Sequence, residues 1–279
     1  MTLDVIVVAA VLASAVLHAS WNALTKASSD PLLNIAIVTA TGGVVLGLAI
    51  PLLPMPRPAV WPYLAASVCL HFAYQLQLVR SYGLGDLSQV YPIARGFAPL
   101  GVAVLALTAG ERPAPLQALG LVMASGAIAS LALSGSDRGR STAATRSALI
   151  TAVLIAAYTF VDGLGVRVGG DVATYVAWSF FLDSFPIVAT ALYLRRTSAS
   201  RFVRTEGLRA VAGGIVATLG YGLVLWALAR GPMAPISALR ETSVIFGAFI
   251  GTRILGEPFG ARRVAAAGVL ALGLLLVQS

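Results

Sequence analysis

Two stretches decide the fold of this chain: Ser88-Gln89-Val90-Tyr91-Pro92-Ile93-Ala94-Arg95 and Met233-Ala234-Pro235-Ile236-Ser237-Ala238-Leu239-Arg240. Each opens an apolar run long enough to cross a bilayer, and each run closes on Gly-Glu, at Gly110-Glu111 and at Gly256-Glu257. Placing an arginine in hydrocarbon costs about 2.5–3.5 kcal/mol on insertion scales. A chain that does so twice, at matching places, is expected to have two related halves that face a polar cavity.

The composition predicts a polytopic membrane protein. Of the 279 residues, 58% are hydrophobic and 11% are charged, whereas about 25% of the residues in soluble domains are charged. The net charge is +8, but nucleic-acid binding would need a basic patch on a polar fold. We therefore expect a lipid bilayer as partner and no nucleic acid. The single Cys69 excludes an internal disulfide.

Ten segments qualify as membrane-spanning helices, which need about 20 mostly apolar residues. They are 4–26, 32–53, 59–82, 87–109, 115–134, 145–167, 172–194, 207–229, 234–254 and 261–277. The first is a helix rather than a signal peptide, because no positive charge precedes it. The longest polar breaks are 135–146 and 195–206, so binding chemistry is expected among the helices.

The basic residues predict the orientation. Loops after even-numbered spans hold four of them, and loops after odd-numbered spans hold 13. By the positive-inside rule the odd loops are cytoplasmic, and both termini lie on the extracytoplasmic side of the inner membrane.

The repeat predicts the architecture. If spans four and nine correspond, residues 1–134 form one five-helix half, 135–146 a linker and 147–279 the second half. An odd number of spans per half inverts the second copy in the membrane, an arrangement typical of secondary transporters. The expected fold is an all-α integral membrane protein of ten transmembrane helices in two inverted five-helix repeats.

The whole chain resembles the EamA-type family of the drug/metabolite transporter superfamily, in its ten spans, its five-helix halves, its short loops, and Gly110-Glu111 and Gly256-Glu257. Within the family it is similar to bacterial amino-acid exporters of the YddG type. The resemblance implies a secondary transporter that exports amino acids, aromatic ones among them, or similar small metabolites. The family also includes exporters of nucleosides and drugs, so the substrate stays open.

Polar and aromatic side chains recur at three- and four-residue spacing within several spans, which places them on one helix face. Such a cavity would offer hydrogen-bond donors, acceptors and aromatic faces, a mixture that suits a small zwitterion. The expected walls are spans one, three and four against spans six, eight and nine. The candidate substrate-binding residues are His18, Asn22, His71, Gln75, Tyr91, Arg95, Tyr158, Tyr221 and Glu241.

Several of these residues also have structural interpretations. The two histidines could simply hydrogen-bond neighbouring helices, and Arg240 or Glu241 could bridge helices. Glu111 and Glu257, at helix ends, favour capping or an ion pair with an arginine. Asp162 and Asp183 are costly against lipid, so both are expected to face protein or water. Pro235 is expected to weaken its helix near the cavity.

Other functional classes find less support. A membrane-embedded enzyme needs convergent acids, histidines or metal ligands, and the sequence has two histidines and no such motif; no cofactor is expected. A channel needs rings of carbonyls or like charges. A lipid flippase or a drug exporter of the same superfamily remains open, as do proton coupling and the choice between monomer and homodimer.

Overall fold

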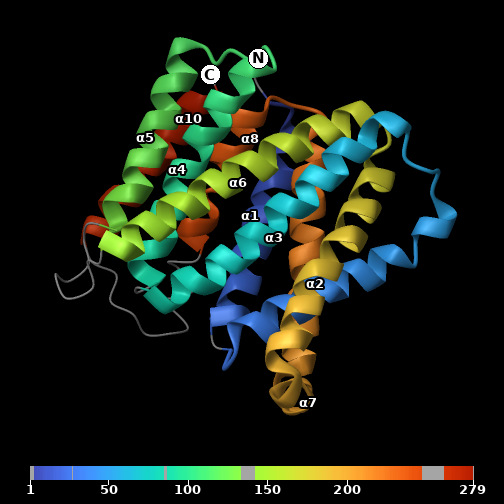
Figure 1. Ribbon diagram of the computed structural model, residues 1–279. Coiled ribbons are helices and arrows are strands. Elements are labelled where there is room, and N and C mark those ends of the chain that lie inside the picture. Colours follow the sequence, from blue (N-terminus) through green and yellow to red (C-terminus); the bar gives the residue numbers. More distant parts are fainter. Residues whose placement is uncertain (1–2, 27, 85–86, 133–141, 247–260, 279) are drawn as a thin grey trace.

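The computed structural model describes residues 3–26, 28–84, 87–132, 142–246 and 261–278, and over these residues it contains helices and no strand (Figure 1). The helices are α1 (Val5–Lys26), α2 (Pro31–Gly47), η1 (Ile50–Leu52), η2 (Pro58–Val60), α3 (Trp61–Leu84), α4 (Leu87–Thr108), α5 (Pro115–Ala132), α6 (Thr142–Gly169), α7 (Val172–Leu228), α8 (Met233–Arg240) and α10 (Ala261–Gln278). The start of α1 and the end of α10 lie at the same end of the bundle (Figure 1). We call this the terminal end.

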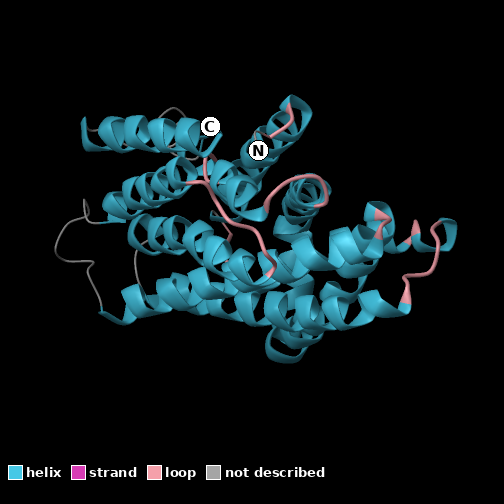
Figure 2. Cartoon of the chain, turned by 90° about the horizontal axis from the view of Figure 1, so that it is seen from above, coloured by secondary structure: helices cyan, strands magenta, loops and turns pink. Residues whose placement is uncertain are grey.

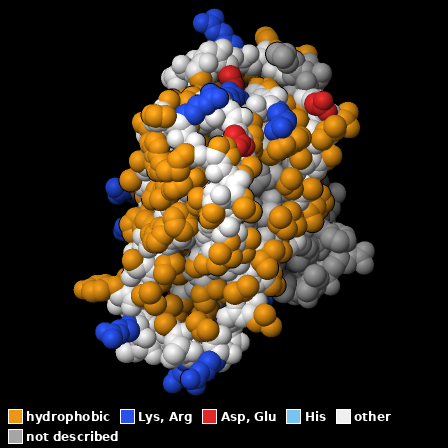
Figure 3. All heavy atoms as spheres, turned by 90° about the vertical axis from the view of Figure 1, so that its right-hand side faces the viewer, with side chains coloured by type: hydrophobic (Ala, Val, Ile, Leu, Met, Phe, Trp, Pro, Cys, Tyr) orange, Lys and Arg blue, Asp and Glu red, His pale blue; other side chains and the backbone are white. Residues whose placement is uncertain are grey.

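The outer surface is apolar. Within the described residues, four helical segments are long and apolar enough to cross a membrane: Val5–Asn22, Pro31–Leu52, Thr142–Gly169 and Val172–Leu228. Large hydrophobic side chains point outward, as Leu208 does with 87% of its surface exposed. Figure 3 shows hydrophobic side chains over most of one face, with Lys and Arg mainly near its two ends. These features are consistent with a multi-pass membrane protein.

The expected polar break at 195–206 lies within helix α7. This helix runs for 57 residues and departs from helical geometry at Arg195 (φ −124°, ψ 22°). Since about 20 residues span the hydrocarbon core, α7 is long enough for two crossings. The chain departs from helical geometry only at Arg195, and residues 196–206 are helical. We call 172–194 the first leg, 196–228 the second leg, and the end that holds Arg195 the kink end (Figure 1).

The kink is tied to the start of α2. Arg195 Nε lies 2.9 Å from Asp30 Oδ2. The other oxygen of Asp30 accepts hydrogen bonds from the backbone N–H groups of Leu32 (3.0 Å) and Leu33 (3.2 Å), and Pro31 occupies the first turn. One carboxylate therefore caps α2, where a negative charge is favourable, and holds the turn of α7.

The expected continuous span 234–254 is interrupted. Helix α8 ends at Arg240, and the N–H groups of Glu241 and Thr242 bond to carbonyls three residues back rather than four. Such a tight stretch inside a helical run often marks a hinge. Pro235 is not the cause, because it lies in the first turn of α8, where a missing N–H is tolerated. Residues 247–260 lie outside the described part.

The helices pack in layers that leave α1, α3 and α6 in the middle. Figure 2, seen from the terminal end, shows the helical layers. Helix α5 packs against α10 on one side, and α2 against α7 on the other. Between them, α4 and α3 pack on α6, and α1 packs on α7. This arrangement positions side chains from both halves of the chain toward a common interior.

A pair of glycines lets α5 and α10 approach closely. A Cβ at Gly120 would lie 2.5 Å from the carbonyl oxygen of Gly273, and one at Gly273 would lie 2.7 Å from the backbone nitrogen of Ala124. Gly126, on the same helix, has nothing within 4 Å of an added Cβ. Backbone atoms cannot move aside as side-chain ends can, so the two glycines of α5 differ in what they tolerate.

We expect Gly120→Ala to lower the free energy of unfolding by about 1–3 kcal/mol, the usual cost of overpacking. Gly126→Ala should leave it unchanged or raise it slightly, because alanine favours helix. Thermal unfolding of the two variants in detergent, followed by size-exclusion chromatography, measures the difference. Equal melting temperatures would contradict this packing of α5 on α10.

Candidate functional site

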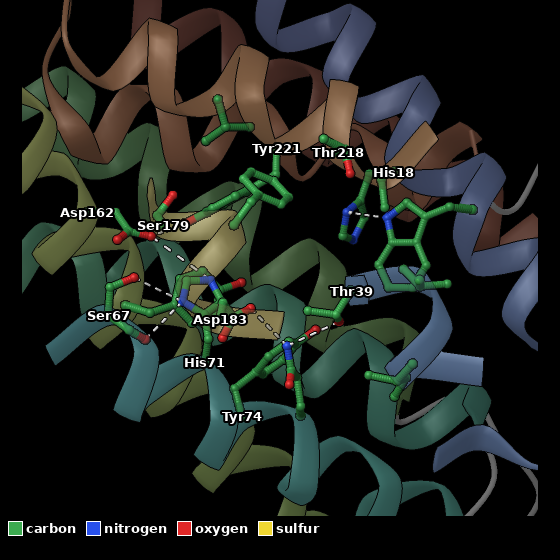
Figure 4. A pocket seen from close by; sticks show the side chains of 18 of the residues that line it. His18, Thr39, Ser67, His71, Tyr74, Asp162, Ser179, Asp183, Thr218 and Tyr221 are labelled. Carbon is green, nitrogen blue, oxygen red and sulfur yellow. Dashed lines mark hydrogen bonds and ion pairs between the residues drawn. The ribbon is translucent and has the colours of Figure 1, made fainter. Parts of the chain in front are cut away.

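A cavity of about 130 Å³ lies inside the bundle. Within the described residues its lining comes from α1, α2, α3, α6, both legs of α7 and the last residue of α8 (Figure 4). The lining residues are Ser14, His18, Trp21, Ile35, Val38, Thr39, Ser67, His71, Tyr74, Gln75, Leu78, Tyr158, Asp162, Ser179, Phe180, Asp183, Ala217, Thr218, Tyr221, Val224 and Arg240.

Asp162 is a fully buried carboxylate with both oxygens satisfied. Its Oδ1 accepts a hydrogen bond from the Tyr175 hydroxyl (2.9 Å), and its Oδ2 accepts one from the Tyr221 hydroxyl (2.5 Å). Hydroxyl bonds to a carboxylate are short and strong. The expectation that Asp162 faces protein rather than lipid is thus met by two tyrosines from the two legs of α7.

His71 is held between Ser67 and Asp162 (Figure 4). Its Nδ1 lies 3.1 Å from the Ser67 carbonyl oxygen. The Ser67 hydroxyl, which can donate, lies 3.2 Å from the same nitrogen, so these two contacts fit either tautomer of the imidazole. Nε2 faces Asp162, 4.0 Å from Oδ2. The ring stacks on Tyr158, with 4.2 Å between centroids, which fixes the imidazole in the cavity wall.

His18 lies on the opposite side of the labelled group (Figure 4). The indole Nε1 of Trp21 donates to its Nδ1 at 3.2 Å. Because an indole nitrogen only donates, Nδ1 accepts, and a neutral His18 carries its proton on Nε2. Nε2 of a neutral His18 is therefore a hydrogen-bond donor.

Gln75 and Asp183 form a second polar group. Gln75 Nε2 donates to Asp183 Oδ2 (3.1 Å) and to Thr39 Oγ1 (3.4 Å). The remaining oxygens, Gln75 Oε1 and Asp183 Oδ1, are buried and have no hydrogen-bond partner in the described part of the chain. These two acceptors are unsatisfied.

Arg240 brings a positive charge to the cavity wall. It is 3% exposed, and its guanidinium carbon lies 5.7 Å from the centre of the Tyr221 ring, within cation–π range. Its Nη1 has no hydrogen-bond partner among the described residues. The cavity wall therefore carries charges of both signs, from Arg240 and from Asp162 and Asp183.

The structure brings some of the candidate residues from the sequence together and separates others. His18, His71, Gln75, Tyr158 and Tyr221 line the cavity. Asn22 does not; its amide donates to the His18 carbonyl one turn back in α1 (2.8 Å). The side chain of Tyr91 lies outside the described residues.

Arg95 and Glu241 pair with each other instead of lining the cavity. Arg95 Nε lies 2.8 Å from Glu241 Oε2, and both side chains are at most 3% exposed. Arg95 Nη2 also donates to Ser243 Oγ at 3.4 Å. The pair joins α4 of the first half to the break after α8 in the second half, as the structural interpretation of Glu241 allowed.

Helix α2 and the first leg of α7 contribute lining residues that the expected walls omitted. These include Thr39, Ser179, Phe180 and Asp183, whereas α4 contributes none among the described residues. Asp183 carried a usable signal, because an aspartate inside an apolar run needs a polar environment. Thr39 and Ser179 carried none, since small hydroxyls are common in membrane helices.

A polar network around Arg167 connects helices at the terminal end. Arg167 lies 2.6 Å from Glu111 and donates to the carbonyls of Leu228 (2.8 Å) and Gly231 (2.6 Å). Glu111 also accepts from the Met233 N–H at the start of α8 (2.7 Å). Both roles expected for Glu111, cap and ion pair, are therefore present. Glu257 lies outside the described residues.

Comparison with known proteins identifies a family domain in residues 146–279. Residues 146–279 match the model of the EamA-like transporter family. No curated protein matches the chain. Of the 28 solved chains that match, one, described as "Crystal structure of protein", is 18% identical with a TM-score of 0.75, over 97% of this chain and 94% of that one. Similarity at this identity shows the fold alone. Residues 146–279 carry an EamA family domain, of the drug/metabolite transporter superfamily.

Proposed function

We propose that the protein is a secondary transporter of the inner membrane that exports amino acids, aromatic ones among them, or similar small metabolites by alternating access. The observation that carries the proposal is the cavity, which is lined from both halves of the chain and has charged groups of both signs. The EamA family domain at 146–279 supports a transporter. The substrate class rests on the chemistry of the cavity.

We further propose ten spans in two inverted five-helix repeats, with the legs of α7 as spans seven and eight. The packing supports this. If span one is exchanged with span six, span two with span seven, and so on, the packed helix pairs below are exchanged with packed pairs. The pair α5–α10 maps onto itself, and so does α2 with the first leg, which meet at Gly43 and Ser184. The pair of α1 and the second leg, which meet at Leu17 and Gly220, maps onto α6 and α3.

The size and lining of the cavity support a small substrate. An engineered cavity of about 150 Å³ binds benzene, so a cavity of about 130 Å³ is on the scale of one aromatic side chain. The aromatic rings of Trp21, Tyr74, Tyr158 and Phe180 offer faces for an apolar side chain. The polar groups between them can orient an ammonium or a carboxylate.

Closure at the terminal end supports alternating access. A buried apolar cluster there unites both halves, including Val7, Leu64 and Val102 with Val166 and Leu225. The network of Glu111 and Arg167 adds a polar tie at the same end. Release toward this end requires the cluster to separate, and the glycine contacts of α2 and the break after α8 are places where helices can shift.

The direction of export depends on orientation. We place the kink end in the cytoplasm, because 13 basic residues follow odd-numbered spans and four follow even-numbered spans. In a Cys69→Ala background, a cysteine replacing exposed Ser200 should react with a membrane-impermeant maleimide only in inverted vesicles. One replacing exposed Arg112 should react only in intact cells. The opposite labelling would reverse the orientation and leave the fold untouched.

Reconstitution tests the function. Liposomes that contain the purified protein and are loaded with labelled phenylalanine or leucine should release the label faster than loaded liposomes without protein. Parallel liposomes carry a fluorescent lipid or a lipophilic cation. If these move and no amino acid does, the flippase or drug-exporter function replaces the proposal.

Gln75 and Gln77 offer a matched pair for the role of the cavity. Gln75 lines it, whereas Gln77, on the same helix, donates to Ser147 Oγ (2.8 Å) outside the lining. We expect Gln75→Ala and His71→Ala to cut phenylalanine transport by about tenfold, the effect of one lost hydrogen bond to a charged group, while both proteins still fold. Gln77→Ala should keep transport. Loss of folded protein in the cavity variants would identify those residues as structural bridges.

A further inference from the structure

Three buried polar atoms of residues that line the cavity lack a hydrogen-bond partner within the described part of the chain. They are Nη1 of Arg240, Oδ1 of Asp183 and Oε1 of Gln75. An unsatisfied buried polar group destabilises a protein, so each needs an explanation. One donor and two acceptors on the same cavity define the ligand that would satisfy them.

The two acceptors lie together. A carboxylate cannot donate, so the Gln75 amide must turn its nitrogen to Asp183 Oδ2 (3.1 Å), which leaves Oε1 as an acceptor. Asp183 forms no ion pair with any described residue, so none of the described residues neutralises its charge at ion-pair distance. An ammonium carries a positive charge, three donors and no acceptor, and it complements this pair.

Asp162 is not part of this acceptor site, although it lines the same cavity. Both of its oxygens already accept from tyrosine hydroxyls, and His71 lies 4.0 Å away. A ligand ammonium would have to displace these bonds to reach Asp162. At Asp183 it would only complete an unfilled set.

The donor site is Arg240. The two deep arginines of the repeat differ here, because Arg95 is neutralised by Glu241 at 2.8 Å, whereas Arg240 has no acid within ion-pair distance among the described residues. A guanidinium binds a carboxylate through two parallel hydrogen bonds. The Tyr221 ring beside Arg240 limits where that carboxylate can lie.

We propose that the cavity binds its substrate as a zwitterion, with the ammonium at Asp183 and Gln75 and the carboxylate at Arg240. This assignment rests on the proposed function and narrows it to compounds that carry both groups. Tyr74, Tyr158 and Phe180 remain for an apolar side chain.

Two analogues of phenylalanine separate the two ends of the site. Phenethylamine lacks the carboxylate, and 3-phenyllactate carries a hydroxyl in place of the ammonium. In competition with labelled phenylalanine for the reconstituted protein, each should bind at least about tenfold more weakly than phenylalanine, because each loses a charge-assisted contact. This comparison needs no substitution and decides the outcome even if a variant does not fold.

Two substitutions assign each end to its residue. Asp183→Asn should remove most of the discrimination against 3-phenyllactate and keep that against phenethylamine, and Arg240→Gln should do the reverse. Arg230→Gln is the control, because Arg230 is exposed and packs on the Trp226 ring outside the cavity; both discriminations should remain.

The outcomes distinguish this inference from the proposed function. Two results would show that the zwitterion site is wrong while the proposed function stands. In the first, the wild-type protein transports phenylalanine but both analogues compete as well as unlabelled phenylalanine does. In the second, folded Asp183→Asn and Arg240→Gln proteins keep both discriminations. If the wild-type protein transports no amino acid, the proposed function itself is wrong.

Discussion

Replacement of Glu241 by alanine is expected to lower the free energy of unfolding by about 3–5 kcal/mol, because it breaks a buried ion pair by removing one of its two members. Arg95 and Glu241 are at most 3% exposed and lie 2.8 Å apart, so water cannot replace the lost partner. The pair also connects the two halves of the chain. We expect most of the Glu241→Ala protein to aggregate on size-exclusion chromatography at temperatures where the wild type stays monodisperse.

A double substitution separates the cost of an uncompensated charge from the value of the pair. Arg95→Met with Glu241→Leu should recover most of the loss, because apolar residues of similar volume often replace a buried ion pair without net destabilisation. Glu206→Ala serves as control, since this glutamate lies near the surface and bonds Ser29; about 1 kcal/mol or less is expected. An unchanged melting temperature for Glu241→Ala would rule out the pair.

Hydropathy and turn residues predict most helix boundaries closely. The expected spans 87–109 and 115–134 correspond to α4 (Leu87–Thr108) and α5 (Pro115–Ala132), because Gly110 and Pro113 punctuate the chain between them. The sequence did not predict the short turn of α7, because only Arg195 leaves helical geometry. Polar residues on both sides of it remain helical, and polarity alone does not distinguish a loop from a helix that extends beyond the hydrocarbon.

The cost of burying charge predicts that a polar residue in an apolar run has a partner, but it does not predict which one. Arg95 and Arg240 occupy matching places in the repeat, yet Arg95 meets Glu241 and Arg240 lines the cavity. The choice depends on the break after α8, which directs the two neighbouring side chains Arg240 and Glu241 differently. No proline lies at that break to mark it in the sequence.

Asp183 shows the limit of the repeat as a guide to the site. The repeat draws attention to spans whose sequences visibly correspond, and the first leg of α7 is not one of them. Asp183 accepts a hydrogen bond from Gln75 of α3, on a leg that α2 approaches closely at Gly43. Small residues allow such approaches, but the sequence does not state which helix fills the space.

Glu111 is expected to be the most important residue at the terminal end. Glu111→Ala removes the ion pair with Arg167 and the cap on the Met233 N–H at once. Hydrogen bonds to charged groups contribute about 1.5–3 kcal/mol each. The side chains of Arg167 and Glu111 are 30% and 19% exposed, so solvent screens the pair, and we expect a combined loss of about 2–3 kcal/mol, less than the sum of two such bonds.

A glutamine at the same position divides the loss. Glu111→Gln keeps an oxygen that can accept from Met233 but removes the charge that faces Arg167, so about half of the loss should remain. Arg112→Ala, at the exposed neighbouring position, should leave the melting temperature unchanged. Part of the effect of Glu111→Gln should disappear in high salt, because ions screen a half-exposed pair, whereas the cap should be insensitive to salt. If Glu111→Gln destabilises the protein as much as Glu111→Ala at every salt concentration, the cap is not formed by this side chain, and the terminal end is held by the apolar cluster and the backbone bonds of Arg167.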